Sequence, residues 1–119
     1  MRDKDRVWKI GEAVARKYLE NKGYEILEQN YRTRYAEIDL VAQKNEVLVF
    51  IEVRTKTGEL FGSPEETINR KKLKRIWQNA DNYVKMKKWN GQYRIDAVGI
   101  VLNLDSSVAR LEHYEDIIN

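Results

Sequence analysis

The chain has 119 residues, of which 42% are hydrophobic and 34% charged, and its net charge of +3 is typical of a soluble globular protein. It contains no cysteine and a single histidine, His113, which excludes disulfides and thiolate metal sites and nearly excludes histidine-rich zinc sites and Ser-His-Asp triads. No segment approaches the roughly 20 apolar residues of a membrane span, and the polar N-terminal segment is not a signal peptide. We therefore expect one cytoplasmic domain over residues 1–119, without membrane association.

The first helix is predicted over residues 5–22, with Gly23 as its C-terminal stop. Apolar residues recur along it at helical spacing and form one broad face. Glu12 lies at the margin of this face, in line with Trp8 and Leu19, so we expect its carboxylate to point along the boundary of the core. The alternative is an ordinary solvated glutamate on a helix surface.

Three strands are predicted next, over residues 24–31, 35–41 and 47–56. Residues 43–46 form the turn between the second and third of them. The run 47–53 is almost continuously hydrophobic, which predicts a central strand covered on both faces.

A second helix is predicted from residue 64 to about residue 88. Ser63 is a suitable N-cap, Pro64 suits the first helical position, and Glu66 lies three residues after the cap. We expect the core-facing stripe of this helix to consist of Leu73, Ile76, Trp77, Ala80, Tyr83 and Val84.

The chain ends with a strand over residues 93–102, a turn, and a short last strand over residues 108–114. The element order is thus α-β-β-β-α-β, with one further strand. A helix between the third and fourth strands permits a parallel crossover. The sequence therefore predicts an α/β protein with a mixed central sheet flanked by helices.

Two carboxylates, Asp39 and Glu52, interrupt the apolar runs of the second and third strands. They lie equally far from a turn centred on Asn45 and Glu46, so a tight hairpin would place them opposite each other on one face. Facing like charges are destabilising unless a cation lies between them. This pattern predicts a divalent-metal site with oxygen ligands, which favours Mg²⁺ or Mn²⁺.

Glu52, Arg54 and Lys56 alternate onto the same face of the third strand. An acid two residues before a base, beside a facing aspartate, suits phosphodiester hydrolysis, in which a metal activates water and a cation steadies the phosphate. Glu12 would be a third carboxylate if the first helix packs across this edge. The competing interpretation is a set of surface salt bridges on a half-exposed hairpin.

Basic residues gather in the second half of the chain. Residues 64–89 contain eight Lys or Arg against three Asp or Glu, which is typical of a nucleic-acid-binding surface. Trp8, Trp77 and Tyr83 could stack on bases, although helical spacing favours the core. We assign phosphate contacts to Arg32, Arg34, Lys71, Lys72 and Lys74.

Short motifs along almost the whole chain, from about residue 8 to 114, resemble the UPF0102 (YraN-like) family in order and spacing. They are Gly11-Glu12-x-x-Ala15, Tyr18-Leu19, Gly23-Tyr24, Asn30-Tyr31-Arg32, Glu37-Ile38-Asp39-Leu40, Val49-Phe50-Ile51-Glu52-Val53-Arg54, Phe61-Gly62 and Arg94-Ile95-Asp96. That family looks like a branch of the restriction-endonuclease-like, PD-(D/E)xK superfamily and is similar to archaeal Holliday-junction resolvases.

The resemblance implies a restriction-endonuclease-like fold and a nuclease site in which Glu12, Asp39 and Glu52 bind Mg²⁺ or Mn²⁺. Arg54 stands where the superfamily has its lysine. Because a guanidinium cannot act as a base, Lys56 is the alternative amine. By analogy with the resolvases we expect a homodimer.

Three functions stay open on the sequence. The first is a metal-dependent endonuclease that hydrolyses DNA, with branched or Holliday-junction-like DNA as one substrate class. The second is a catalytically inactive nucleic-acid-binding module that keeps the nuclease fold, which Arg54 in place of lysine would support. The third is a protein-interaction domain whose charged residues form a structural salt-bridge cluster.

Overall fold

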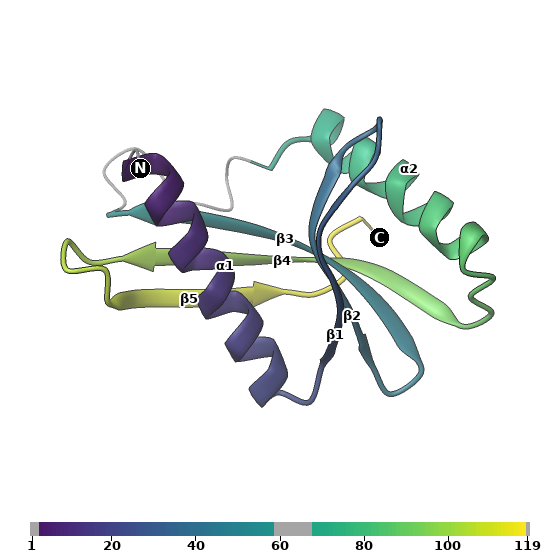
Figure 1. Cartoon of the computed structure of the whole chain (residues 1–119), viewed down its shortest axis with the longest axis horizontal. Helices are drawn as coiled ribbons and strands as arrows, with labels where there is room; N and C mark the ends of the chain where they lie inside the picture. Colours follow the sequence, from purple (N-terminus) through teal and green to yellow (C-terminus); the bar gives the residue numbers. More distant parts are fainter. Residues whose placement is uncertain (1–2, 59–67, 119) are drawn as a thin grey trace.

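The structure is a computed structural model that describes residues 3–58 and 68–118. In these ranges two helices and five strands follow one another in the order predicted from the sequence (Figure 1). The elements are α1 (Asp3–Asn21), β1 (Glu25–Arg32), β2 (Glu37–Lys44), β3 (Val47–Thr57), α2 (Arg70–Met86), β4 (Gln92–Leu102) and β5 (Val108–Tyr114). Within these described ranges, no helix is both long enough and apolar enough to cross a membrane.

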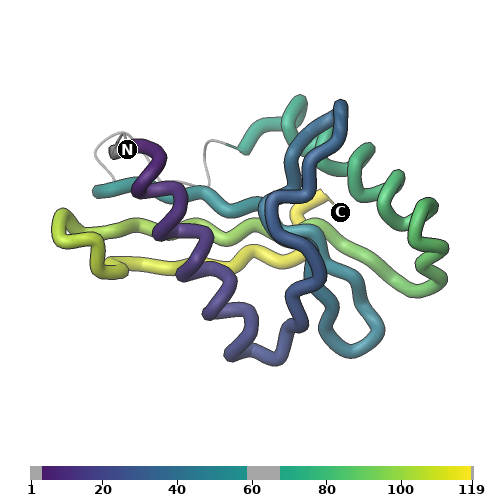
Figure 2. The backbone as a smooth tube through the Cα atoms, in the orientation of Figure 1, coloured from purple at the N-terminus to yellow at the C-terminus, as the bar shows by residue number. Residues whose placement is uncertain are grey.

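The five strands form one mixed sheet in the order β1-β2-β3-β4-β5. Strands β3 and β4 are parallel and every other neighbouring pair is antiparallel. The predicted crossover is confirmed, since α2 lies between the two parallel strands in the chain. The sheet is strongly twisted, so the β1–β2 hairpin runs across the direction of β4 and β5 (Figure 2).

Each face of the sheet carries its own hydrophobic core, one beneath α1 and one beneath α2. Strand β3 contributes to both, because Val49, Ile51 and Val53 join the α1 core while Leu48 and Phe50 join the α2 core. This explains the continuous hydrophobic run and confirms β3 as a central strand. By the same alternation, the next side chain on the α2 face of β3 is that of Glu52.

The predicted start of the second helix is wrong. Helix α2 begins at Arg70, and Asn69 is its N-cap, with an extended backbone and a side-chain oxygen that accepts a hydrogen bond from the Lys72 N–H at 2.9 Å. An extended residue cannot continue a helix from residue 64. The predicted cap at Ser63 lies outside the described residues.

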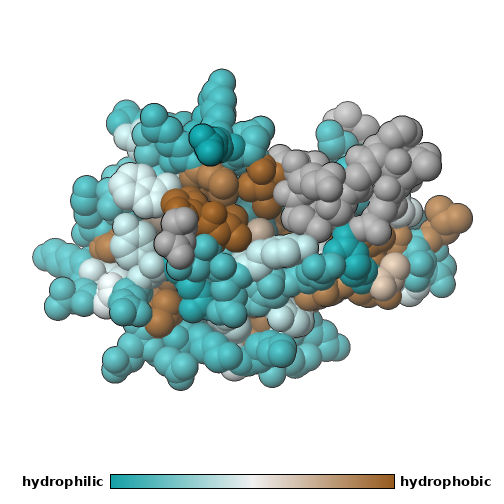
Figure 3. Space-filling model, turned by 180° about the vertical axis from the view of Figure 1, so that it is seen from behind, coloured by the Kyte–Doolittle hydropathy of each residue, from teal (hydrophilic) through white to brown (hydrophobic). Residues whose placement is uncertain are grey.

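The predicted core stripe of α2 is confirmed at Ile76, Ala80, Tyr83 and Val84, but not at Leu73 and Trp77. Ile76, Ala80 and Tyr83 are buried against the sheet, but Trp77 is 43% exposed. One residue beyond Ile76, Trp77 is turned about a quarter of the way around the helix and faces the C-terminal segment instead. There it lines a groove with Leu73, Ile117 and Ile118. Figure 3, which shows the molecule from behind, also has hydrophobic side chains exposed on its surface.

Helix α1 approaches β3 so closely that only a glycine fits at Gly11. A Cβ atom there would lie 2.7 Å from the Cβ and 2.8 Å from the Cγ2 of Thr55, and it would overlap the Thr55 hydroxyl. Such separations are far below van der Waals contact. Gly11 therefore sets the height of α1 above the sheet, and with it the positions of Trp8 and Glu12.

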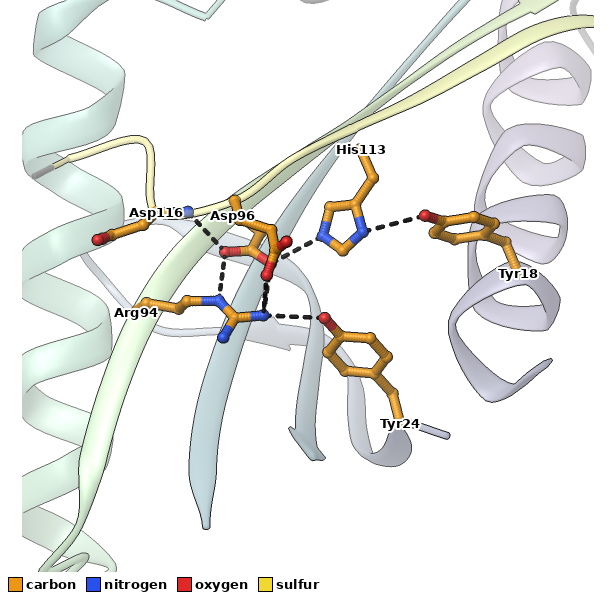
Figure 4. Close-up of polar contacts among 7 residues, drawn as sticks. Tyr18, Tyr24, Arg94, Asp96, His113 and Asp116 are labelled. Carbon is orange, nitrogen blue, oxygen red and sulfur yellow. Dashed lines mark hydrogen bonds and ion pairs between the residues drawn. The ribbon is translucent and has the colours of Figure 1, made fainter. Parts of the chain in front are cut away.

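A buried aspartate, Asp96 on β4, organises the side of the sheet formed by β4 and β5 (Figure 4). Its carboxylate accepts hydrogen bonds from Arg94 Nε at 3.0 Å, His113 Nε2 at 2.8 Å and the Asp116 N–H at 2.9 Å. Burial alone would raise the pKa of Asp96, but these hydrogen bonds outweigh it and lower the pKa below its usual value. Asp96 is thus an ionised anchor that ties β5 and the C-terminal segment to β4.

The single histidine links this anchor to α1. Because an ionised Asp96 can only accept, His113 donates from Nε2, and its Nδ1 is hydrogen-bonded to the Tyr18 hydroxyl at 3.2 Å. Arg94 also donates to the Tyr24 hydroxyl at 2.8 Å. His113 and Asp96, whose roles the sequence left open, belong to this structural network.

Replacing Gly11 with alanine is expected to destabilise the protein by about 2 kcal/mol, although the same change in an exposed helix stabilises by roughly 0.5–1 kcal/mol. The reason is the overlap with Thr55. Urea unfolding monitored by circular dichroism measures the change, with the exposed Lys9→Ala as control. The loss should shrink in a Thr55→Ala background, because the Oγ1 and Cγ2 atoms are gone. A Gly11→Ala variant more stable than the wild type would contradict the close approach.

Asp96→Asn is expected to cost about 3 kcal/mol at neutral pH, because it leaves Arg94 and His113 without their buried anion. Since the pKa of Asp96 is lowered in the fold, its contribution is full above the unfolded pKa of about 4 and is lost as the pH falls through the folded pKa. The difference between variant and wild type should therefore narrow in acid.

The matched control is Glu115→Gln. Glu115 pairs with the same Arg94 at 2.9 Å but is mostly exposed, so its loss should cost below about 1 kcal/mol. Denaturant titrations across the acid range measure both variants. An equal loss at neutral and acid pH, or equal losses for the two variants, would show that Asp96 is not the ionised anchor.

Candidate active site

The β2–β3 hairpin has the predicted register. Leu40 pairs with Ile51 and Lys44 with Val47, around a turn at Asn45 and Glu46 in which Asn45 has a positive φ of 55°. Asparagine tolerates this conformation better than most residues, so it suits the turn.

Asp39 and Glu52 are the next residues of the two strands beyond this ladder. They are only 6% and 3% exposed. An oxygen of Asp39 accepts the Val53 N–H at 2.7 Å, which holds the aspartate against β3, and the two carboxyl groups lie within hydrogen-bonding reach of each other. The prediction that they face each other across the hairpin agrees with this geometry.

Two cations neutralise Glu52 through a single oxygen. Its Oε1 lies 3.0 Å from Arg54 Nη2 and 3.1 Å from Lys72 Nζ. Its Oε2 is buried and has no hydrogen-bond partner among the described residues while Asp39 is ionised, and Arg54 Nε is likewise buried without a partner there. Unpartnered buried polar atoms are costly, and within residues 3–58 and 68–118 the buried side-chain atoms that lack a partner lie at this site.

The acid pair holds its protons unusually tightly. Burial, together with the charge of Glu52, raises the pKa of Asp39 to about 8, although the hydrogen bond from the Val53 N–H lowers this pKa. Burial also raises the pKa of Glu52 to about 7, although Arg54 opposes this change. The two groups titrate together, so the pair retains a proton close to neutral pH. Carboxyl groups with strongly shifted pKa values that line a hollow indicate a candidate functional site.

The pair opens into a hollow of about 530 Å³. The walls come from α1, the loop between β1 and β2, strands β2 and β3, and the start of α2. The cations on these walls are Arg54, Lys71, Lys72 and Arg75, and the aromatic side chains are Trp8 and Tyr35. The hollow thus combines an acidic floor with a basic and aromatic rim.

Glu12 is buried, so its interpretation as a solvated helix residue is wrong. It is 2% exposed, and Asn30 Nδ2 donates to its two oxygens at 2.9 and 3.1 Å. Burial raises the pKa of Glu12, and the Asn30 hydrogen bond opposes this. Glu12 lines an adjoining hollow, and in the described part of the chain no group of three or more acidic or histidine side chains is placed to hold a metal. Its role as a third metal ligand stays a prediction.

Asn30 is a site residue to which sequence reasoning gave no role. It lies within β1 but has a positive φ of 53°, in a strand whose pairing with β2 is already irregular. A residue with a left-handed backbone inside a strand is strained and persists only where its surroundings hold it in place. The two hydrogen bonds from the Asn30 side chain to Glu12 hold it in this conformation. The available signal in the sequence was the residue type, since asparagine is enriched in this conformation.

The predicted phosphate-binding residues separate into three groups. Lys71 and Lys72 line the hollow that holds Asp39 and Glu52. Arg32, at the end of β1, pairs with Glu37 at 2.9 Å, and Arg34, on the loop that follows, lies beside the ring of Tyr35. Lys74 lines the groove beside Trp77 instead.

Lys56, the alternative amine, lines a neighbouring hollow together with Arg54 and Trp8. The structure therefore does not bring it into the hollow of Asp39 and Glu52. Lys72, from α2, is the lysine that reaches Glu52.

Comparison with known sequences identifies the family. Residues 11–100 match the model of a family described as "Uncharacterised protein family UPF0102". The chain belongs to UPF0102. A UPF0102 protein of Pelotomaculum thermopropionicum is 40% identical over 109 residues, which cover 91% of each chain. A UPF0102 protein of Persephonella marina is 44% identical over 96 residues, covering 80% of this chain and 83% of the relative.

A third relative, a UPF0102 protein of Thermotoga petrophila, is 39% identical over 110 residues, or 92% of this chain and 94% of the relative. The resemblance to UPF0102 that was stated from the motifs is thus confirmed. The segment that matches the UPF0102 model contains Glu12, Asp39, Glu52 and Lys72, whereas Trp8 and His113 lie outside it.

Asp39→Asn is expected to stabilise the metal-free protein by about 2 kcal/mol near pH 8. A raised carboxyl pKa means that the folded state binds more protons than the unfolded state between about pH 4 and 8. The contribution of Asp39 to the free energy of unfolding therefore falls as the pH rises through that window. Asparagine does not ionise and so avoids this decrease, and its side-chain oxygen can still accept the hydrogen bond from the Val53 N–H.

Thermal unfolding in EDTA near pH 5 and pH 8 measures this difference, which should be much smaller at the lower pH. Glu46→Gln, an exposed change in the same hairpin, is the control. The raised pKa of Asp39 would be refuted by a variant that is less stable than the wild type near pH 8.

Proposed function

We propose that this UPF0102 protein is a Mg²⁺- or Mn²⁺-dependent nuclease that hydrolyses DNA phosphodiesters in the hollow of Asp39 and Glu52. The observation that supports this most is the pair of buried carboxylates from adjacent strands, open to one hollow and rimmed by four cations. Acidic groups suit a metal ion and basic groups suit a phosphate, so the hollow is complementary to both parts of such a reaction. The resemblance to the PD-(D/E)xK superfamily agrees with this assignment.

The residues fit a divalent cation. Mg²⁺ is commonly bound by one or two carboxylates, with waters and substrate phosphate oxygens as the other ligands. Asp39 and Glu52 would hold it, and the buried Oε2 of Glu52 lacks any other partner among the described residues. Glu12, oriented by Asn30, is proposed as the third carboxylate. When bound, the metal would lower the pKa of a water molecule and neutralise charge on the phosphate.

The side chains around the acid pair have separable roles in this proposal. Arg54 cannot accept a proton, but its guanidinium can hold a phosphate oxygen. Lys72 supplies an amine 3.1 Å from Glu52, in the hollow where Lys56 is not found. We therefore assign to Lys72 the task that a strand lysine performs in the superfamily. Lys71 and Arg75 would bind neighbouring phosphates.

One observation favours the alternative function, a nucleic-acid-binding module without catalysis. Arg54 and Lys72 both pair with Glu52, so the chain neutralises this carboxylate by itself. A site that is already neutral has less need of a metal ion. In this case the basic rim would still bind nucleic acid.

The test is cleavage of labelled DNA, supplied as duplex, single-stranded and four-way-junction substrates, with Mg²⁺ or Mn²⁺. Asp39→Asn and Glu52→Gln should each lower the rate on the order of 100-fold or more, because they remove charge that must bind the metal. Lys72→Gln should lower it by about tenfold or more. Lys85→Gln, on the exposed last turn of the same helix, is the control and should leave the rate unchanged.

Calorimetric titration with Mn²⁺ gives a readout that does not depend on activity, and Asp39→Asn should abolish the binding. Salt-dependent DNA binding without cleavage at any metal concentration, unaffected by Asp39→Asn, would establish the inactive module instead. Absence of both metal and DNA binding at low salt would reject both functions.

A further inference from the structure

Trp8 is exposed although it lies on the inward line of α1. Glu12, Ala15 and Leu19 follow it on the same line at helical spacing and are buried. Trp8 itself is 40% exposed. The helix therefore turns its largest aromatic side chain toward the sheet side, at the end of α1 where the surroundings do not fully cover it.

The space around Trp8 is the candidate active site. Its side chain lines the hollow that holds Asp39 and Glu52, the hollow beside Lys56 and the hollow beside Glu12. A tryptophan placed between carboxylates and cations is not explained by core packing. Exposed aromatic side chains in a basic hollow are typical of ligand-stacking surfaces.

Tyr35 brings a second aromatic ring to the same hollow from the loop between β1 and β2. It is 37% exposed, and the Arg34 guanidinium lies 5.0 Å from its ring centroid. Arg34 also donates from Nη2 to the Tyr35 hydroxyl at 2.9 Å, which helps to fix the orientation of the ring.

The loop that holds Tyr35 is fixed to α2. The buried Asn79 side chain donates to the Ala36 carbonyl at 2.8 Å and accepts from the Thr33 hydroxyl at 2.6 Å. The Tyr35 N–H in turn donates to the Thr33 hydroxyl oxygen at 3.1 Å. The loop is thus held in place before any ligand binds, which lowers the entropic cost of stacking.

We propose that Trp8, assisted by Tyr35, stacks on an unpaired nucleobase of the strand whose phosphodiester lies against Asp39 and Glu52. This inference rests on the proposed nucleic-acid function and names its substrate class, which is nucleic acid with an unpaired nucleotide at the site rather than uninterrupted duplex. In a duplex, both faces of each internal base are stacked on neighbouring bases, so no face is available to Trp8. Every base has a π-face, so the site does not discriminate sequence.

The basic residues of α2 complete such a site. Lys71 and Arg75 are exposed and line the same hollow as Trp8, so they can bind the phosphates that flank the stacked base. This arrangement, an aromatic platform beside a basic groove, is the common design for single-stranded nucleic acid. The phosphate contacts give affinity for any nucleic acid, and the stacking adds the preference for unpaired bases.

The test measures binding without cleavage, by fluorescence anisotropy in EDTA at low salt. The probes are a labelled single strand of about 15 nucleotides and the same sequence as a blunt duplex. Trp8→Ala should weaken binding of the single strand by about tenfold and leave binding of the duplex within about twofold. Trp8→Phe should restore most of the loss, because phenylalanine also stacks.

Trp77→Ala is the matched control, since Trp77 is a similarly exposed tryptophan that lines a separate groove. It should leave both affinities unchanged. In addition, the single strand should quench tryptophan fluorescence in Trp77→Phe but much less in Trp8→Phe. Circular dichroism melts confirm that each variant is folded.

The outcomes separate this inference from the proposed function. Equal weakening of single strand and duplex by Trp8→Ala, or no weakening of either, overturns the stacking role while metal-dependent cleavage can still be observed. If the wild type binds neither probe at low salt, the nucleic-acid function and the stacking role fail together.

Discussion

The placement of two carboxylates against each other inside a hydrophobic hairpin is the constraint on which the site depends. The β2–β3 register brings Asp39 and Glu52 together, and the tight turn at Asn45 and Glu46 sets that register. The repulsion is offset by the hydrogen bond from the Val53 N–H to Asp39 and by the ion pairs of Glu52 with Arg54 and Lys72. It is also reduced because the acid pair keeps a proton close to neutral pH. Stability of the two cores thus maintains a local arrangement that is unfavourable by itself.

The same residue type behaves in opposite ways on β2 and on β4. Asp96 is fully buried, yet three hydrogen bonds lower its pKa, and its network joins α1, β4, β5 and the C-terminal segment. Asp39 is almost equally buried, but it receives one backbone hydrogen bond and faces another acid, so its pKa rises to about 8. A satisfied carboxylate stabilises a fold, whereas an under-satisfied one next to a hollow can bind a ligand. This contrast assigns Asp96 to structure and Asp39 to the site.

Local pattern predicted the element order, the hairpin register and the acid pair, because strand alternation and turn position are properties of neighbouring residues. Local pattern gave wrong or incomplete predictions where contacts between segments far apart in the chain determine the structure. The capping signal at Ser63 is strong, but α2 starts after Asn69. The exposure of Trp8 and Trp77, the bond between Asn30 and Glu12, and the contact of Lys72 with Glu52 all depend on how α1 and α2 lie on the sheet. Such contacts join residues 18 or more positions apart, and no periodicity reports them.

The two cations on Glu52 connect the resting site with the proposed reaction. Arg54 and Lys72 both lie on Oε1, so the carboxylate is neutralised at one oxygen, while its other oxygen has no partner in the described part of the chain. A phosphodiester entering the hollow would compete for both cations, since phosphate and carboxylate oxygens suit the same donors. With its cations engaged by the phosphate, Glu52 would carry a less compensated charge and would be a better ligand for a divalent cation. Under the proposed function, substrate binding and metal binding would therefore favour each other. The phosphate would pair with Arg54 and Lys72, and the metal would neutralise the Glu52 carboxylate that these cations no longer neutralise.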